Sequence, residues 1–197
     1  SQVVGYCAAA VYLEAEEPHF VLSSEEKKEL LRIAQSTINL YVSKNKILDY
    51  QTQNPNFLTK KGAFITLKKE GRLRGCIGFI ESVLPLHQAI IQTSIYAASK
   101  DRRFYPVSSS ELRDLEIEIS VLSPLKKISD PDIVEIGKHG LFISRGDKRG
   151  LLLPQVPVEN GWSRNVFLQQ LCLKAGLPRN AWESGTDLYV FEAVVFH

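Results

Sequence analysis

The chain has 197 residues, of which 44% are hydrophobic, and its 24 basic and 22 acidic residues give a formal net charge of +2. This length and apolar content suffice for a core in one domain, or in one domain with a smaller lobe. The near balance of charge argues against nucleic acid as an obligate partner. The longest apolar run is far shorter than the roughly 20 residues that span a bilayer, and no signal peptide pattern opens the chain.

Cysteine usage and the absence of known motifs narrow the class of protein further. Three cysteines, Cys7, Cys76 and Cys172, are widely spaced and odd in number, which argues against a disulfide framework and fits a reducing compartment. We therefore expect a cytoplasmic protein with no membrane segment. The chain contains no Cys-x-x-Cys, His-Glu-x-x-His, phosphate-loop or dinucleotide motif, so the sequence predicts no metal and no cofactor.

The N-terminal part reads as a short strand followed by a helix. Residues 3–12 form an apolar, strand-like run, and residues 14–18 are acidic and end in proline, as linkers often do. Ser23 and Glu26 match a capping box, and apolar residues then recur at helical spacing as far as Val42. The sequence thus divides into an N-terminal strand and linker, residues 1–22, and a main domain, residues 23–197.

A β-hairpin is the next predicted element. Residues 63–67 and 73–79 each alternate as strands do, and Lys-Glu-Gly between them supplies a turn. The period of two places Arg74 and Cys76 on one face of the second strand, roughly 6.6 Å apart, where a guanidinium favours a thiolate. Gly75 and Gly78 would leave the backbone open to a ligand. The hairpin is therefore the first candidate site.

The rest of the chain alternates between strands and two more helices. We expect a helix from Pro85 to about Lys100, and a second one from Ser163 to Ala175. Strands are expected over residues 115–121 and 188–196, with a second hairpin over residues 141–153 that has a long loop at residues 145–150. Hairpins and scattered helices without βαβ repetition predict an α+β fold, with a mainly antiparallel sheet and flanking helices.

Further candidate site residues lie outside the hairpin. Asp101, Arg103 and Phe104 follow a predicted helix end, where loops often carry function, although a structural ion pair and an aromatic plug explain them equally well. Glu118 is a candidate base if its strand lies near Cys76, or an ordinary residue of a solvated sheet face. Gln155 and Glu159 are candidates for the same site, unless the nearby prolines simply fix an edge segment. Cys172 lies among apolar residues of a helix and is predicted to be core.

The order of motifs from residue 23 to the C-terminus resembles the AMMECR family. The matching segments are residues 62–67, 73–78, 101–107, 115–124, 150–159 and 172–178. The resemblance implies a two-lobed protein with a cleft beside the Arg-Gly-Cys strand, in a family without an established activity. It also implies a functional association with a Memo-like protein and a radical-SAM protein, because prokaryotic members look like one component of that set. Residues 3–12 are similar to the last strand of Memo-like proteins, so the chain is either the C-terminal part of a fusion or has an ordinary strand extension.

Three functions stay open at this point. The first is a thiol-dependent enzyme or ligand-binding protein, in which Cys76 is the nucleophile, Arg74 holds an anionic group, Glu118 or Asp101 handles protons and Arg103 positions the ligand. The second is a non-catalytic adaptor that binds a protein or a small molecule in the same cleft. The third and least favoured is a nucleic-acid-associated regulator, because the net charge is low.

Overall fold

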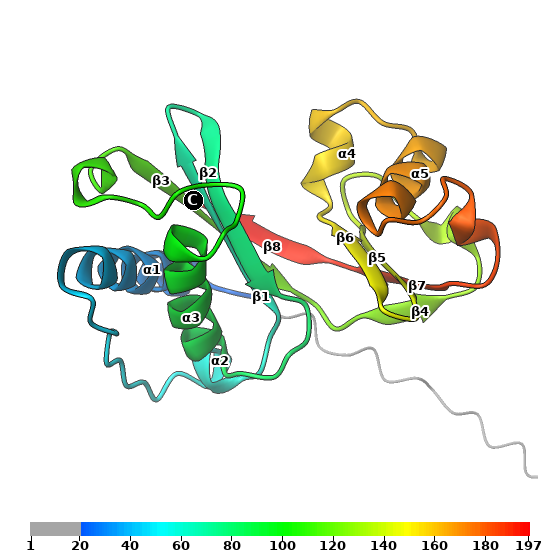
Figure 1. Cartoon of the computed structure of the whole chain (residues 1–197). Coiled ribbons are helices and arrows are strands. Elements are labelled where there is room, and N and C mark those ends of the chain that lie inside the picture. Colours follow the sequence, from blue (N-terminus) through cyan, green and yellow to red (C-terminus); the bar gives the residue numbers. More distant parts are fainter. Residues whose placement is uncertain (1–20) are drawn as a thin grey trace, which may run out of the picture.

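The computed structural model describes residues 21–197, so the strand and linker expected within residues 3–18 lie outside the described residues. Two lobes stand side by side, and each contains a four-stranded sheet with helices packed on it (Figure 1). Every strand pairing among these residues is antiparallel. The predicted α+β class is confirmed, with two separate sheets. No helix within residues 21–197 combines the length and the apolar content needed to cross a membrane.

The first lobe has the strand order β2-β1-β3-β8 and carries three helices. Its elements are α1 (Ser24–Lys44), α2 (Pro55–Leu58), β1 (Ala63–Lys69), β2 (Arg72–Phe79), α3 (Leu86–Ser99), a short 3-10 helix (Ser109–Glu111), β3 (Leu115–Leu122) and β8 (Ala193–Phe196). The second lobe has the order β4-β7-β5-β6. Its elements are β4 (Lys126–Ile128), β5 (Gly140–Arg145), β6 (Lys148–Leu152), α4 (Gln155–Glu159), α5 (Arg164–Lys174) and β7 (Asp187–Phe191), with 3-10 turns at Pro131–Ile133 and Ala181–Glu183.

Local sequence signals set the ends of the long helices. The predicted capping box is present, because Ser23 accepts from the backbone N–H of Glu26 and the Glu26 carboxylate accepts from that of Ser23. Helix α1 ends at Lys44 and is capped by Asn45, which adopts a left-handed conformation with φ of 50°. Pro85 precedes α3, and Ser163 caps α5, both as predicted.

The first sheet has one face toward the helices and one toward the second lobe. On the helix side, Ile65, Leu67 and Ile119 are fully buried against residues of α1 and α3. The opposite face, called the cleft face below, carries Phe64, Thr66, Cys76, Glu118 and Ser120. Strand pairing places Thr66 directly between Cys76 and Glu118, so these three residues form one row across β2, β1 and β3.

Two crossing strands join the lobes. The chain passes from β3 into the second lobe at Ser123 and returns to β8 at Glu192. The backbone N–H of Ser123 donates to the Glu192 carbonyl at 2.8 Å, and the Glu192 N–H donates to Oγ of Ser123 at 2.9 Å. An apolar cluster beside this crossing, in which Leu122 and Phe191 are buried and Phe64 packs at the margin, fills the space between the lobes. The lobes are therefore closed against each other at the crossing.

Two sequence expectations differ from the structure, and one segment takes a form that the sequence left open. The predicted strand over residues 188–196 is divided at Glu192, because its two halves belong to different sheets. The long loop predicted at residues 145–150 is wrong: Arg145 pairs with Lys148 across a tight turn in which Gly146 has a positive φ. The segment after Pro154, left open between a cleft-lining and an edge role, forms the short helix α4.

Candidate functional site

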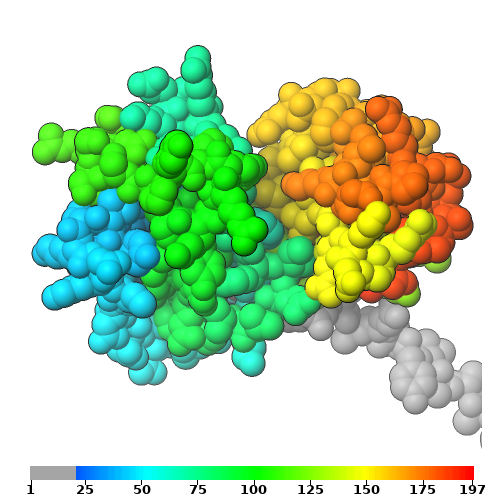
Figure 2. Space-filling view, viewed as in Figure 1, coloured from blue at the N-terminus to red at the C-terminus, as the bar shows by residue number. Residues whose placement is uncertain are grey.

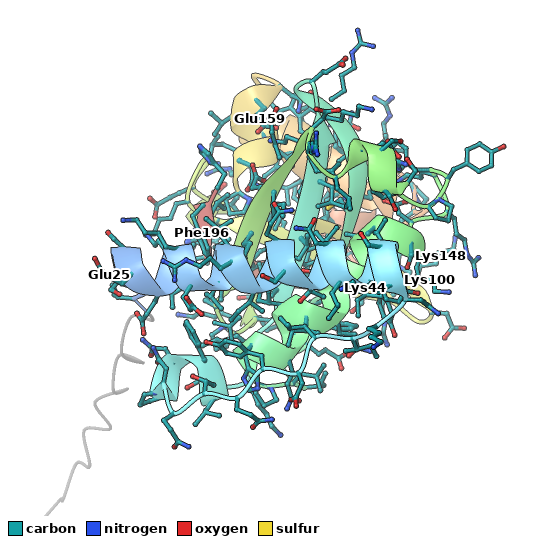
Figure 3. All side chains as sticks on the ribbon, turned by 90° about the vertical axis from the view of Figure 1, so that its left-hand side faces the viewer. Glu25, Lys44, Lys100, Lys148, Glu159 and Phe196 are labelled. Atoms are coloured by element: carbon teal, nitrogen blue, oxygen red, sulfur yellow. The ribbon has the colours of Figure 1, made fainter. Side chains whose placement is uncertain are left out.

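The candidate site is the space between the cleft face of the first sheet and the helices of the second lobe. The space-filling view shows the two lobes facing each other across a furrow (Figure 2). Figures 1 and 3 both place α4, which carries the labelled Glu159, level with the β1–β2 turn and away from the strand crossing. The furrow is thus closed at the crossing and open at the turn.

Cys76 lies on the cleft face with its side chain partly exposed. The Thr66 hydroxyl donates to its sulfur at 3.3 Å. Glu118 lies in the same row one strand further on, so its Cα is about 10 Å from that of Cys76, given the usual spacing of strands. Among the described residues, the hydrogen-bond partners of the Glu118 carboxylate are Lys68 and Gln155. The structure thus places Cys76 and Glu118 on one face but does not pair them.

The Asp101–Arg103 pair covers the outer edge of β2 at Cys76. Oδ2 of Asp101 accepts from the backbone N–H of Cys76 at 2.9 Å, and Nη2 of Arg103 donates to the Cys76 carbonyl at 3.4 Å. Arg103 also pairs with Asp101 at 2.7 Å, and mainly for this reason the pKa of Asp101 falls from 3.8 to about 2. Both groups that β2 would expose at its edge are therefore satisfied, and Arg103 is held beside Cys76.

Arg74 has a bracing role. It is the extra residue of a β-bulge, because Leu67 pairs with Gly75 while the next residue of β1 pairs with Leu73. The bulge interrupts the alternation of side chains along β2, on which the prediction that Arg74 and Cys76 share one face depends. Its guanidinium donates to both carboxylate oxygens of Glu111, at 2.9 and 3.1 Å. It also donates to the backbone carbonyls at positions 105 and 106. Arg74 is thus engaged by Glu111 and the loop rather than by the thiol.

Glu111 and Phe104 complete this brace. The hydrogen bond from Arg74 is the main reason why the pKa of Glu111 falls to about 2. The Phe104 ring lies within cation–π range of two guanidinium groups, at 6.0 Å from that of Arg74 and 5.5 Å from that of Arg103. Phe104 therefore links the residues that support β2 to the arginine beside Cys76.

Lys174, at the end of α5, is a site residue that the sequence reasoning did not single out. Its side chain is accessible to solvent, yet desolvation by surrounding protein lowers its pKa, as expected for a group in a recess. The next influences on this pKa are the charges of Cys76, which raises it, and Arg103, which lowers it. Lys174 therefore lies within electrostatic range of Cys76 and Arg103, although it belongs to the opposite lobe. The only sequence signal was its place in the family-like segment 172–178, beside the buried Cys172.

Acidic residues gather at the β3 side of the same cleft. Nζ of Lys68 donates to Oε2 of Glu118 at 3.0 Å, and this bond is the main reason why the pKa of Lys68 is raised. The charges of Glu159 and Glu116 raise it further. Gln155 of α4 donates to the other oxygen of Glu118 at 3.4 Å, so one hydrogen bond crosses between the lobes here.

Gly75 and Gly78 have packing roles in the structure. A Cβ at Gly75 would lie 2.3 Å from the backbone oxygen of Ala97 in α3, and one at Gly78 would lie 2.2 Å from the Phe64 ring. The open backbone expected at these positions is therefore filled by protein. Glycine is required at these two positions because a helix approaches Gly75 closely and an aromatic ring approaches Gly78 closely.

Comparison with known proteins gives a consistent assignment. Residues 31–196 match the sequence profile of AMMECR1. Protein MK0488 of Methanopyrus kandleri is 44% identical over 185 residues, which cover 89% of each chain, and Protein MJ0810 of Methanocaldococcus jannaschii is 42% identical, covering 89% of this chain and 92% of that protein. The crystal structure of the uncharacterized protein PH0010 from Pyrococcus horikoshii superposes with a TM-score of 0.85 at 38% identity, covering 88% of this chain and 92% of that one. The chain belongs to the AMMECR1 family.

Proposed function

We propose that the inter-lobe cleft binds a small anionic molecule and presents it to the Cys76 thiol, which acts as a nucleophile or covalent acceptor. One observation carries this proposal: Cys76 is partly exposed on the cleft face, and the Arg103 guanidinium is held beside it by a hydrogen bond to the Cys76 carbonyl. Arg103 is paired with Asp101, whereas no carboxylate of the described chain forms an ion pair with Lys174. The charge of Lys174, which lies within electrostatic range of Cys76 and Arg103, is therefore available to an anionic ligand.

Neither acidic candidate of the site is well suited to take up the thiol proton. Asp101 is a weak base, because its pKa of about 2 keeps it ionised and bound to Arg103 and the β2 backbone. Glu118 is separated from Cys76 by Thr66 and is bonded to Lys68 and Gln155. The thiol proton is therefore released to solvent, to which the partly exposed Cys76 has access.

The test compares how fast charged thiol reagents modify Cys76. The Cys7→Ser protein, which keeps only Cys76 and the fully buried Cys172, is treated with the anionic sulfonatoethyl and the cationic trimethylammonioethyl methanethiosulfonates. We expect the anionic reagent to react several-fold faster, and Lys174→Ala to remove that preference. Lys138→Ala, which deletes an exposed lysine of the same lobe, is the control and should retain it. Equal rates for both reagents in the unmodified protein would overturn the proposal.

An adaptor function is the second candidate, and one residue favours it. The Tyr105 side chain is 91% exposed at the tip of the loop that Arg74 and Glu111 brace. A protruding aromatic residue on a rigid loop is typical of a protein contact. The probe is a purified Memo-like protein, titrated by calorimetry against Tyr105→Ala and Cys76→Ser variants. Binding that is lost with Tyr105→Ala and kept with Cys76→Ser would support the adaptor, whereas no binding to the unmodified protein would reject this partner.

A further inference from the structure

Thr66 occupies the middle of the row on the cleft face, between Cys76 of β2 and Glu118 of β3. Its side chain is buried, so the hydroxyl has little contact with solvent. The hydroxyl donates to the Cys76 sulfur at 3.3 Å. Because a hydroxyl has a single proton to donate, the acceptor that takes this proton decides which of the two neighbours Thr66 supports.

The backbone of β2 explains why this hydroxyl lies nearer to the thiol than to the carboxylate. The N–H of Cys76 donates to Asp101, and its carbonyl accepts from Arg103, so both groups point away from β1. Cys76 and Thr66 are therefore a non-hydrogen-bonded pair, in which facing Cα atoms are only about 4.5 Å apart. Since the two backbone groups of a strand residue point to the same side, Thr66 forms the wider, hydrogen-bonded pair with Glu118, at about 5.5 Å.

The competing acceptor in the row is already occupied. A carboxylate accepts a hydrogen bond more strongly than a thiol sulfur does. The two oxygens of Glu118 are instead bonded to Nζ of Lys68 at 3.0 Å and to the amide of Gln155 at 3.4 Å. Thr66 also has a branched Cβ, which restricts the rotation of its side chain. The hydroxyl is therefore held on the thiol side of the row.

From this geometry we infer that Thr66 is a positioning residue of the proposed site, whose hydroxyl stabilises the Cys76 thiolate that attacks the ligand. The inference rests on the proposed function, because a hydrogen bond to the sulfur affects a reaction only if Cys76 acts as a nucleophile. Hydrogen bonds to a charged partner are roughly twice as strong as neutral ones, so the hydroxyl binds a thiolate more strongly than a thiol. The bond therefore favours the ionised form of Cys76.

Charged groups lie around Cys76 on the loop after α3, on α5 and on β3. Asp101 and Arg103 of the loop bond to its backbone, and Lys174 of α5 lies within electrostatic range. Glu118 of β3 lies in the same row, two strands away. A substitution in β1 that keeps the shape of the side chain removes none of these charges. Their effects on the thiol therefore cancel when such a variant is compared with its parent.

A neutral disulfide tests the hydroxyl without involving the charge of the cleft. The Cys76 thiolate attacks one sulfur of bis(2-hydroxyethyl) disulfide, the S–S bond breaks, 2-mercaptoethanol leaves as its thiolate, and the other half stays on Cys76 as a mixed disulfide. The parent is the Cys7→Ser protein, in which Cys172 is fully buried. Rates of modification are measured by mass spectrometry at pH 7 and at pH 10.

Three variants of this parent are compared. Thr66→Val keeps the branched shape and lacks the hydroxyl, whereas Thr66→Ser retains the hydroxyl. Thr37→Val is the matched control, because it deletes a buried threonine hydroxyl of α1 that donates to the Ile33 carbonyl. Circular dichroism at both pH values checks that each variant is folded.

We expect Thr66→Val to react about threefold more slowly than the parent at pH 7 and about twofold faster at pH 10. At pH 7 a cysteine is largely a thiol, so loss of the hydrogen bond lowers the share of thiolate about tenfold, and the greater nucleophilicity of the remaining thiolate restores about threefold. At pH 10 cysteines are mostly ionised, so the gain in nucleophilicity dominates. Thr66→Ser and Thr37→Val should match the parent at both pH values.

A reversal of the order between pH 7 and pH 10 supports the inference, because a packing defect would slow the reaction at both. If Thr66→Val matched the parent at both pH values, or were slower at both, the inference would be overturned. The same holds if Thr66→Ser behaved like Thr66→Val, since the hydroxyl would then not be the cause.

The preference between charged reagents tests the proposed function separately. An anionic preference without the reversal overturns the role of Thr66 and leaves the anionic thiol site standing. The reversal without an anionic preference upholds the role of Thr66 at the thiolate and rejects the anionic ligand.

Discussion

The two charged residues beside Cys76 act first on its backbone. Asp101 accepts from the N–H and Arg103 donates to the carbonyl, so the edge of β2 is closed by one ion pair from a single loop. The Asp101 side chain is only 5% exposed. The structural ion pair that the sequence left open is present, and the same contacts hold the charge of Arg103 near Cys76, as the proposed site requires.

Acid should destabilise the protein through these braces. Folding lowers the pKa of Asp101 from 3.8, and that of Glu111 from 4.5, to about 2. Each ionised carboxylate therefore stabilises the fold above its unfolded pKa, on the order of 1–2 kcal/mol, and this contribution is lost as the pH falls toward 2. Urea unfolding of Asp101→Asn and Glu111→Gln should give a deficit at pH 7 that shrinks by pH 2.5. A deficit independent of pH would contradict this account.

Arg74 is expected to matter for stability more than for reactivity. Arg74→Lys removes the two-pronged bond to Glu111 and the bonds to the loop carbonyls, and should lower the free energy of unfolding by about 1–3 kcal/mol. Arg72→Lys, at the exposed start of the same strand, should change it by less than about 0.5 kcal/mol. Denaturant melts measure both. If Arg74→Lys melted like Arg72→Lys while abolishing the preference for anionic reagents, Arg74 would belong to the ligand site.

Residue-level prediction from the sequence worked where the cause was local. The capping box at Ser23 and the burial of Cys172 both follow from neighbours within a few positions, and both are found. The prediction that Arg74 and Cys76 share one face is wrong, because a one-residue bulge in the strand pairing cannot be recognised from the sequence pattern. Lys174 was not recognised, since its proximity to Cys76 arises only when two lobes meet.

At the scale of elements, the contact between β2 and α3 depends on a missing side chain. Gly75→Ala would place a Cβ 2.3 Å from the Ala97 carbonyl, and neither backbone can give way cheaply. We expect a loss of about 1–3 kcal/mol in unfolding free energy, the usual cost of overpacking. Leu73→Ala, at an exposed position of the same strand, is the control and should have little effect. Equal, small losses for both would show that α3 is less closely packed than the structure indicates.

The periodicity of apolar residues in the sequence predicts where most helices and strands lie, but not which strands pair with each other. The hairpin, the strand at residues 115–121 and the three long helices were predicted from spacing and caps, and all are present. The division of the last strand at Glu192 could not be predicted, because its apolar run is continuous while its two halves pair in different sheets. The short helix α4 is not predicted, since Pro154 and Pro157 favour an edge segment, although proline is accepted in a first helical turn.

At the scale of the whole molecule, the pKa of the Lys174 amine reports on how close the two lobes lie. Lys174 should titrate below the ordinary lysine range, because surrounding protein desolvates it. Arg103→Gln should raise its pKa and Cys76→Ser should lower it, since the arginine charge opposes protonation and the thiolate charge favours it. NMR titration of the lysine side chains gives both values. Lys127, whose pKa is raised mainly by its bond to Asp187, is the internal control. If neither substitution changed the pKa of Lys174, the lobes would lie further apart in solution than in this structure.

The crossing at Ser123 and Glu192 makes the second lobe a continuous insertion within the first. All four strands of the second sheet come from residues 126–191, whereas the first sheet needs β8, the last strand of the chain. During synthesis, β3 therefore keeps an unpaired edge until residues 193–196 have left the ribosome. The second lobe closes through nearer contacts, and short sequence separation favours early folding. Pulse-labelled hydrogen exchange should thus protect β5 and β7 before β3 and β8, so the part of the chain made later would fold first.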